Sequence, residues 1–397
     1  MSDWQTLDLP RHKGVPGWEF TELKNFELAS FPKASAGAAS AVVPEPVFAA
    51  PEGSVLLTQV DASWERVEEA TVEGPLVMPL SQAVEQHGEL VDRFLGTVVP
   101  AEDDPFVARN AAEWEGGLFV YVPRHTKLDA PVLASAIQAE QGAALNWRVL
   151  VVLEEGAEAE VWEQYLSSAD GLFTTVVELV VGQNATLRFV SAQDLDEKSL
   201  IFGTQRARIA RDGSLDWVVL GFGSANGKVF QNTILDGEGA SGKVTGAYAT
   251  RGRQHLDFDT TQEHAAANCT SDLAFRGILT GRSSAVWRGM IKVDPGAQQT
   301  DGFQESRNLL LSKKAHADAI PGLEILANDV RCTHAAAIAQ IDPDQVFYLR
   351  SRGLRLQDAE RLVVEGFLAE LVERFEEGPV REALTHALER RLEAVLG

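Results

Sequence analysis

The sequence Gly156-Ala157-Glu158-Ala159-Glu160-Val161 places a glycine turn directly before a strand-like segment. The same form returns twice further along the chain, as Gly182-Gln183-Asn184-Ala185-Thr186-Leu187 and as Gly213-Ser214-Leu215-Asp216-Trp217-Val218. The leading glycines are 26 and 31 residues apart, close to the length of one solenoid turn. Turn-and-strand units that recur at this spacing predict a β-solenoid.

The surrounding sequence extends this pattern over roughly 220 residues, and residues 117–342 form the expected β core. Short segments rich in Val, Ile, Phe and Thr alternate with Gly, Asn and Asp turns, and no amphipathic helix interrupts them. The clearest of these segments are Leu118–Val122, Arg148–Leu153, Thr174–Val181, Thr186–Val190, Leu215–Phe222 and Leu273–Leu279. A sandwich or barrel is the alternative, but this length of strand is long for one sandwich and favours a solenoid.

The flanking regions are expected to be helical. Residues 1–116 contain an Ala/Pro-rich linker at about 30–53, a helix over 81–95 with Ser81 as a possible N-cap, and a second helix over 105–114. In residues 343–397, which follow Asp342, apolar residues step by four in two runs. The runs are Val363, Phe367, Leu371, Phe375 and then Val380, Leu384, Leu388, Leu392, Leu396. These helices are predicted to cover the solenoid end, or to offer an apolar groove to a partner helix.

Composition limits the function. The net charge of −23 argues against general nucleic-acid binding, which depends on cationic patches. The start of the sequence has no basic and apolar signal-peptide regions, and no apolar run approaches the ~20 residues of a membrane span, so a cytoplasmic protein is expected. Only two cysteines are present, Cys269 and Cys332, which excludes a cysteine-only metal cluster held by this chain alone.

The candidate ligands are Cys332 and His334. If their segment is a strand, both side chains face the same side, because side chains alternate along a strand. A thiolate beside an imidazole suits iron or zinc, but such centres usually need four ligands. The pair is therefore predicted to be half of a site that a second chain completes. The alternative is that Cys332 is only a small packing residue.

Two other motifs are weaker candidates for a functional site. The stretch 237–244 resembles a phosphate loop, but a strand rather than a helix is expected after it and Val244 replaces the required hydroxyl, so we read it as a turn. A second group contains His255, Asp257, Asp259, Glu263 and His264. It could bind a metal or supply the paired carboxylates of a β-solenoid carbohydrate-active enzyme, although exposed polar strand faces are common.

The stretch from Trp287 to Gly353 carries a resemblance to a known family. It contains Trp287-Arg288-Gly289, Asn308-Leu309-Leu310-Leu311-Ser312, Pro321-Gly322-Leu323-Glu324-Ile325, Asp329-Val330-Arg331-Cys332-Thr333-His334-Ala335 and Phe347-Tyr348-Leu349-Arg350-Ser351-Arg352-Gly353. In this order and spacing these segments resemble the SufB/SufD family of the SUF iron–sulfur assembly system. Trp18-Glu19-Phe20-Thr21 and Phe106-Val107-Ala108-Arg109-Asn110-Ala111 are similar to the SufD branch.

The resemblance implies a right-handed parallel β-helix with helical N- and C-terminal regions, in a non-catalytic scaffold subunit. It implies pairing with a SufB-like subunit through the β-helix and with a SufC-like ATPase through the C-terminal helices. His334 matches a family histidine proposed to help hold a transient Fe–S cluster in the assembled complex, and Cys332 matches the neighbouring family cysteine. The resemblance makes a homodimer of the isolated chain through the same surface one possibility, and the sequence leaves its oligomeric state open. The resemblance leaves open whether the complex binds reduced flavin, and a purely structural adaptor is the remaining alternative.

Overall fold

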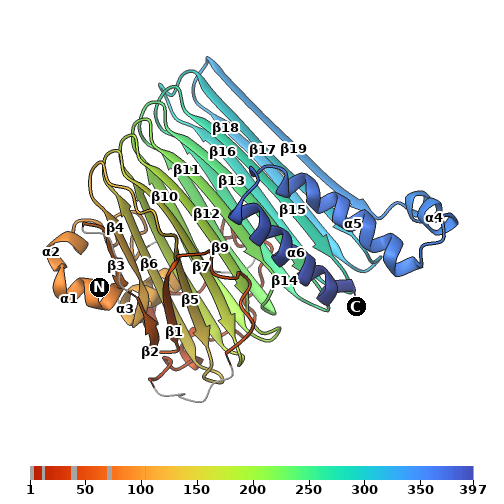
Figure 1. The fold of residues 1–397 in the computed structure, drawn as a ribbon, viewed down its shortest axis with the longest axis horizontal. Coiled ribbons are helices and arrows are strands. Elements are labelled where there is room, and N and C mark those ends of the chain that lie inside the picture. The colour runs from red at the N-terminus through yellow and green to blue at the C-terminus, as the bar shows by residue number, and fades with distance from the viewer. Residues whose placement is uncertain (1–3, 11–13, 37–42, 69–73, 103, 397) are drawn as a thin grey trace.

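The computed structural model describes residues 4–10, 14–36, 43–68, 74–102 and 104–396, and its body is a parallel β-solenoid (Figure 1). The first strands are β1 (Val55–Val60), β2 (Ser63–Val67), β3 (Leu76–Pro79), β4 (Gly116–Val122), β5 (Val132–Gln138), β6 (Ala144–Leu153), β7 (Glu158–Ser167), β8 (Leu172–Val181), β9 (Thr186–Asp194) and β10 (Leu200–Ile209). The remaining strands are β11 (Ser214–Gly221), β12 (Asn226–Leu235), β13 (Ser241–Thr250), β14 (His255–His264), β15 (Thr270–Leu279), β16 (Ser284–Val293), β17 (Thr300–Leu310), β18 (His316–Ile325) and β19 (Val330–Gln340). The helices are α1 (Leu80–Gln86), α2 (Gly88–Val91), α3 (Pro105–Glu113), α4 (Pro343–Ser351), α5 (Leu356–Val372) and α6 (Pro379–Leu396).

The chain from β4 onward alternates between two facing sheets. Even-numbered strands β4 to β18 form one sheet and odd-numbered strands β5 to β19 form the other, and each pairs in parallel with the strand two places on. Leu200 pairs with Asn226, 26 positions later, and Ser284 pairs with His316, 32 positions later. Mainly-β architecture and the solenoid are therefore confirmed, and the sandwich or barrel alternative is wrong.

The turns explain the irregular glycine spacing in the sequence. Gly156, Asn184 and Asp212 each adopt a left-handed φ of +53° to +66°, two residues before β7, β9 and β11. Glycine adopts this conformation freely, and Asn and Asp tolerate it better than other residues do. These three residues are 28 positions apart, so the structural repeat is regular where the leading glycines are not. In the stretch 237–244, residues 237–240 belong to the turn between β12 and β13 and residues 241–244 begin β13, so strand rather than helix follows the turn, as expected.

The interior is an apolar core lying between the two sheets. Alternate residues of each strand point inward, and large side chains such as Trp147, Trp217 and Trp287 are fully buried there. Burial of this apolar surface is the main force that stabilises the stacked turns.

The N-terminal end of the solenoid is covered. Strand β2 pairs antiparallel with β1 and its Trp64 packs beside Trp147 of the interior, and β3 pairs antiparallel with β4. Helix α1 packs against β3, β4 and β6, and α3 packs against β6, β8 and β10. Helix α3 occupies the predicted place, and Asp104 caps it by accepting from the amides of Phe106 and Val107. The predicted cap at Ser81 is wrong, because α1 begins at Leu80 directly after Pro79 and has no side-chain cap.

The segment before β1 packs against the solenoid over much of its length. Trp18 stacks on Phe106 and contacts Phe202 and Phe230 on the outer face of the even-numbered sheet. Phe48 packs edge-on against Trp162 of the other sheet. Residues 37–42 of the expected linker lie outside the described residues. The proposed boundaries at residues 116 and 342 stay predictions.

The C-terminal helices lie on the outer face of the odd-numbered sheet, not over the end of the solenoid. Helix α5 contacts β15 and α6 contacts β13, and Figure 1 shows both helices running across these strands. The prediction that they cover the solenoid end is therefore wrong. The physical reason is that the outer face of this sheet is itself apolar, with Val218, Leu220 and Ile278 buried against the helices. No helix in the described part of the chain combines the length and apolarity of a membrane span.

Candidate functional site

The last turn of the solenoid is left open, and it carries both candidate ligands. At this end β18 and β19 are the edge strands of the two sheets, as β3 and β2 are at the other end, and within the described ranges no other strand pairs with their outer edges. We call these two strands and the side chains they turn inward the open end. Its apolar residues include Leu323, Ile325 and Ile338, each between 38% and 45% exposed. An exposed edge with apolar side chains is a surface suited to pairing with another chain.

Cys332 and His334 face the same side of β19, as the sequence predicted. They are the in-register partners of Gly302 and Gln304 on β17, two positions that face the interior, since Gln304 donates to the Gly289 carbonyl and a Cβ atom at Gly302 would meet Ile291. Both candidate ligands therefore point inward at the open end, where the next turn of a longer solenoid would lie. A docking chain can reach this position because nothing in the described structure covers it.

The Cys332 thiol is partly buried. It packs beside Ile291, Val293 and Ala297 at the start of the last turn. Burial raises the pKa of this thiol, the backbone amide of Gly302 lowers it, and the carboxylate of Asp301 raises it further. The thiol is therefore in its neutral form at physiological pH.

His334 is exposed and lies above Gln304. The Gln304 amide is fully buried and donates to the carbonyl oxygens of Gly322 at 2.9 Å and Gly289 at 3.3 Å. These two hydrogen bonds hold the Gln304 side chain in place inside the solenoid, on the strand next to His334. Among the described residues, no group of three or more His, Cys, Asp or Glu side chains could hold a metal ion. The chain itself thus offers two ligands at this position.

The rival group around Asp257 is a buried ion-pair cluster. The Lys228 ammonium lies 2.8 Å from Asp257, and the Thr21 hydroxyl donates to the same carboxylate at 2.6 Å. Burial raises the pKa of Asp259 to about 6, and Lys228 and Arg288 act in the opposite direction. Thr21 of the N-terminal segment contacts Asp257, and both Asp257 and Asp259 are buried, so the interpretation of this group as an exposed polar strand face is wrong.

Two further members of that group also have structural partners. The Glu263 carboxylate lies 2.7 Å from the Lys292 ammonium on the neighbouring strand. His264 is fully buried inside the solenoid, where its Nε2 lies 2.8 Å from the Ser271 hydroxyl. Burial lowers the pKa of His264 to about 4, so this imidazole is neutral at physiological pH.

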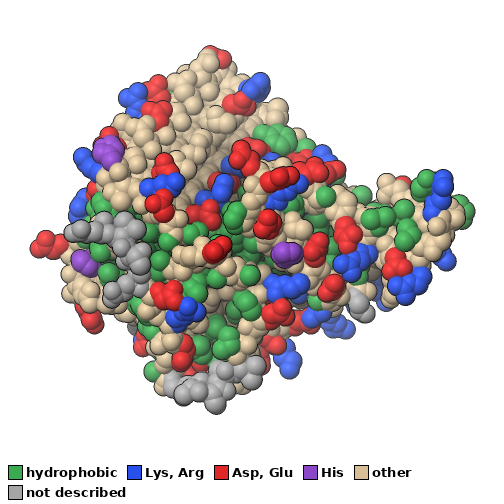
Figure 2. Space-filling view, viewed as in Figure 1, with side chains coloured by type: hydrophobic (Ala, Val, Ile, Leu, Met, Phe, Trp, Pro, Cys, Tyr) green, Lys and Arg blue, Asp and Glu red, His purple; other side chains and the backbone are tan. Residues whose placement is uncertain are grey.

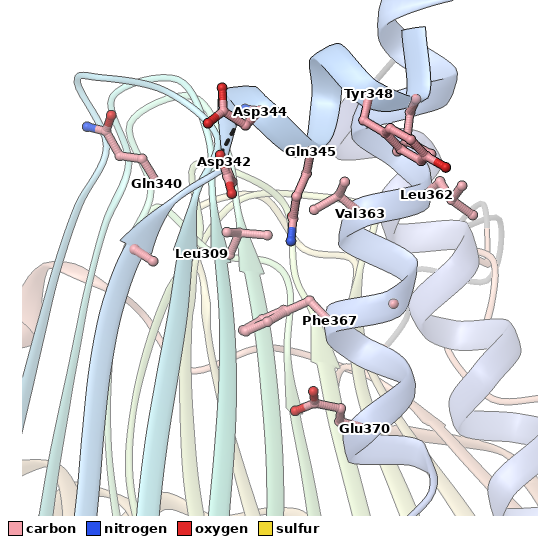
Figure 3. A pocket seen from close by; sticks show the side chains of 13 residues that line it. Leu309, Gln340, Asp342, Asp344, Gln345, Tyr348, Leu362, Val363, Phe367 and Glu370 are labelled. Carbon is pink, nitrogen blue, oxygen red and sulfur yellow. Dashed lines mark hydrogen bonds between the residues drawn. The ribbon is translucent and has the colours of Figure 1, made fainter. Parts of the chain in front are cut away.

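A groove of about 820 Å³ lies beside the open end (Figure 3). Leu309 of β17 forms one wall, Tyr348 of α4 lies across from it, and Val363 and Phe367 project from α5. The sequence predicted Val363 and Phe367 as part of the packed stripe, but the buried residues of α5 are Val364, Leu368, Leu371 and their neighbours. Val363 and Phe367 of the predicted stripe therefore line the groove, whereas its other two members, Leu371 and Phe375, are buried.

Helix α4 projects from the body as a tip (Figure 1). Phe347 and Tyr348 are 72% and 56% exposed there. The guanidinium of Arg352 lies over the Tyr348 ring at 5.2 Å. Figure 2 shows hydrophobic and basic side chains together on this tip, although the chain as a whole is strongly acidic. Sequence reasoning missed this surface, because aromatic residues in a short helix give no sign of whether they are buried.

Comparison with known proteins gives a consistent match. Residues 136–367 match the model described as "SUF system FeS cluster assembly, SufBD core domain", and residues 55–133 match "SufBD protein N-terminal region". The chain is 29% identical to the iron-sulfur cluster assembly protein SufD of Bacillus subtilis, over 98% of this chain and 92% of that protein. It is also 29% identical to an iron-sulfur cluster assembly SufBD family protein of Staphylococcus epidermidis, over 76% of this chain and 65% of that protein.

The core-domain match spans more than half of the chain, and it includes the strands of the open end and the first part of α5. The chain therefore belongs to the SufBD family and takes part in iron–sulfur cluster assembly by the SUF system.

Proposed function

We propose that this chain is a SufD-type, non-catalytic scaffold subunit that pairs through its open end with a SufB-like subunit. The observation that carries the proposal is the contrast between the two ends of the solenoid. At the N-terminal end Trp64 of the antiparallel strand β2 packs over the interior beside Trp147. At the other end, by contrast, the inward-facing Leu323, Ile325 and Ile338 of the parallel strands β18 and β19 are exposed. A second solenoid that stacks on the open end would satisfy the edges of β18 and β19 and bury these side chains.

In this proposal His334 and Cys332 supply part of the coordination of a nascent Fe–S cluster, which is the cargo of the complex. Two ligands from one chain do not complete such a site, since Fe–S clusters are usually held by four protein ligands. The missing ligands would come from the paired subunit. The inward direction of both side chains at the junction suits a site shared between two stacked solenoids.

The groove and the tip of α4 are the proposed docking surface for a SufC-like ATPase. The groove offers apolar side chains from two helices and two strands, and the tip adds exposed aromatic and arginine side chains. Interfaces are enriched in aromatic residues and arginine, so this composition is typical of a protein-binding surface. The proposed surface is separate from the ligand pair on β19.

A structural adaptor is the second candidate function, because Cys332 packs against Ile291 and Val293 as an ordinary core residue would. In that case neither Cys332 nor His334 would contact the cluster. Metal content of the assembled complex separates the two candidates.

The test is to co-express the chain with a SufB-like and a SufC-like protein and to measure iron and sulfide in the purified complex. We expect His334→Ala to lower cluster yield several-fold while subunit stoichiometry stays intact. The matched control is His316→Ala, since His316 is also exposed on an edge strand but belongs to the outer face of β18. Unchanged cluster yield in an intact His334→Ala complex would remove the ligand role and leave the adaptor.

A further inference from the structure

A column of polar side chains runs through the otherwise apolar interior of the solenoid. It begins at Glu163 on β7, which is fully buried. The Tyr165 hydroxyl lies 2.5 Å from the Glu163 carboxylate, and the Trp147 indole N–H donates to the other carboxylate oxygen at 3.1 Å. Thr175 contacts the Tyr165 hydroxyl at 2.9 Å, and the Gln205 amide donates to it at 3.4 Å.

The column continues toward the open end through the strand register. Gln205 on β10 pairs with Gln231 on β12, and Gln231 pairs with Thr260 on β14. Such neighbours lie ~4.8 Å apart on adjacent strands, and all three face the same interior. Val229 and Phe258 lie two residues before Gln231 and Thr260 on the same strands. They therefore face the same interior, and they belong to its apolar core.

Gln304 completes the path where the even-numbered sheet has no polar side chain. The next position after Thr260 is Gly289, and a Cβ atom there would lie 2.3 Å from the Trp287 ring and 2.4 Å from the Gln304 amide oxygen. The Trp287 ring and the Gln304 amide, which reaches across from the other sheet, therefore share the space above Gly289. Its in-register neighbour on β19 is His334, so the column reaches the open end.

Several atoms of this column are buried and have no hydrogen-bond partner within the described chain. They are the amide oxygens of Gln205 and Gln304 and both polar side-chain atoms of Gln231. An unpaired buried polar atom costs ~1–3 kcal/mol, so four in one line are a large cost unless water satisfies them. Buried water sits at polar positions of this kind, where it typically makes about three hydrogen bonds.

We propose that the polar column binds a file of internal water molecules and conducts protons between Glu163 and the open end of the solenoid. When the Glu163 carboxylic acid ionises, its O–H bond breaks and the proton moves to an adjacent water. Successive O–H bonds of water and of the Thr260 hydroxyl then break and re-form along the column, and one proton leaves as hydronium at the open end. Glu163 remains as a carboxylate held by Tyr165 and Trp147. No electron is transferred, and the glutamine amides position the waters.

The ionisation behaviour of Glu163 is consistent with this role. Burial raises the pKa of Glu163 to about 7, although hydrogen bonds from Tyr165 and Trp147 act to lower it. The carboxyl group therefore changes its protonation near neutral pH. Formation of metal–thiolate bonds releases protons, so use of the column during cluster assembly rests on the proposed function, whereas the existence of the column does not.

The test uses the isolated full-length chain, with no partner and no metal. A step from about pH 5 to about pH 9 brackets the Glu163 pKa of about 7. The carboxylic-acid C=O band of Glu163 is followed by time-resolved infrared spectroscopy and is assigned by its loss in Glu163→Gln. We expect Gln231→Leu, which interrupts the column with an apolar side chain of similar size, to slow deprotonation at least about tenfold, because the proton must then wait for local opening of the fold.

The matched control is Thr233→Val, two positions further along β12, which also replaces a buried polar residue with an apolar one but lies outside the column. It should leave the rate unchanged. Thr260→Val removes the hydroxyl from the column but keeps the shape of the side chain. If Gln231→Leu does not fold, the deprotonation rate of Thr260→Val is compared with that of the wild type instead. Equal deprotonation rates in the wild type and in the folded column variants would overturn the proposal.

Discussion

Glu163 makes the stability of the chain depend on pH in a definite direction. Its pKa rises from an ordinary value of 4.5 to about 7 on folding. The folded state therefore binds more protons than the unfolded state between these values, so the free energy of unfolding falls as pH rises from about 4.5 to 7 and is then level. A shift of this size corresponds to roughly 3 kcal/mol.

The variant Glu163→Gln should remove this dependence, because the glutamine cannot ionise. Urea unfolding at about pH 5 and about pH 8 should show the wild type losing stability between the two conditions by up to roughly 3 kcal/mol more than the variant. Parallel stability profiles for the two proteins would show that folding does not raise the pKa of Glu163.

At the same scale, the sequence identified Cys332 and His334 but missed Glu163 and Gln231. The first pair could be predicted because two residues on one strand share a face by local geometry alone. The second pair could not, because their relation depends on which residues of different turns come into register. Turns of 26 to 32 residues hide that register from inspection of a single sequence.

Among the elements, α5 carries two apolar stripes with separate roles. Leu368 is buried against the odd-numbered sheet, whereas Tyr348 of α4 and Val363 of α5 line the groove. The sequence predicted both C-terminal helices and their apolar character correctly. It could not determine which stripe faces the sheet, since neighbouring stripes on one helix are both apolar and only the shape of the sheet selects between them.

Substitutions in these elements should separate stability from binding. We expect Leu368→Ala to lower the free energy of unfolding by ~2–4 kcal/mol, because it leaves a cavity against the sheet. Tyr348→Ala should change stability by less than ~0.5 kcal/mol, because its side chain is largely exposed. Capture of a SufC-like ATPase should instead fall several-fold for Tyr348→Ala, as measured by pull-down beside thermal unfolding. Full capture by Tyr348→Ala would exclude the tip from the docking surface.

The whole molecule is a solenoid with one covered end and one open end. The turn motifs predicted the solenoid because each turn repeats the same backbone conformation. Gly156, Asn184 and Asp212 occupy equivalent positions in it, each with a left-handed φ. The open end could not be predicted with the same tools. The sequence favoured helices over that end, and the apolar outer face of the odd-numbered sheet binds them instead.

An open end of this kind should make the isolated chain self-associate. We expect a homodimer formed by two open ends, and Ile338→Lys should convert it to a monomer, because lysine on an edge strand opposes further strand pairing. Val67→Lys is the matched control, since Val67 is also an exposed residue of an edge strand but lies on β2 at the covered end. Sedimentation velocity measures the result. A dimer that persists in Ile338→Lys and dissociates in Val67→Lys would assign the self-association to the wrong end.

Pairing of the open end with a SufB-like subunit is tested most directly by hydrogen–deuterium exchange of the chain alone and in the complex. The backbone amides on the unpaired outer edges of β18 and β19 should become strongly protected from exchange on binding. The exchange rates of the amides of β2 and β3 at the covered end should stay unchanged. Protection confined to the covered end, with β18 and β19 exchanging as fast as in the isolated chain, would contradict the proposed pairing and the shared site at Cys332 and His334.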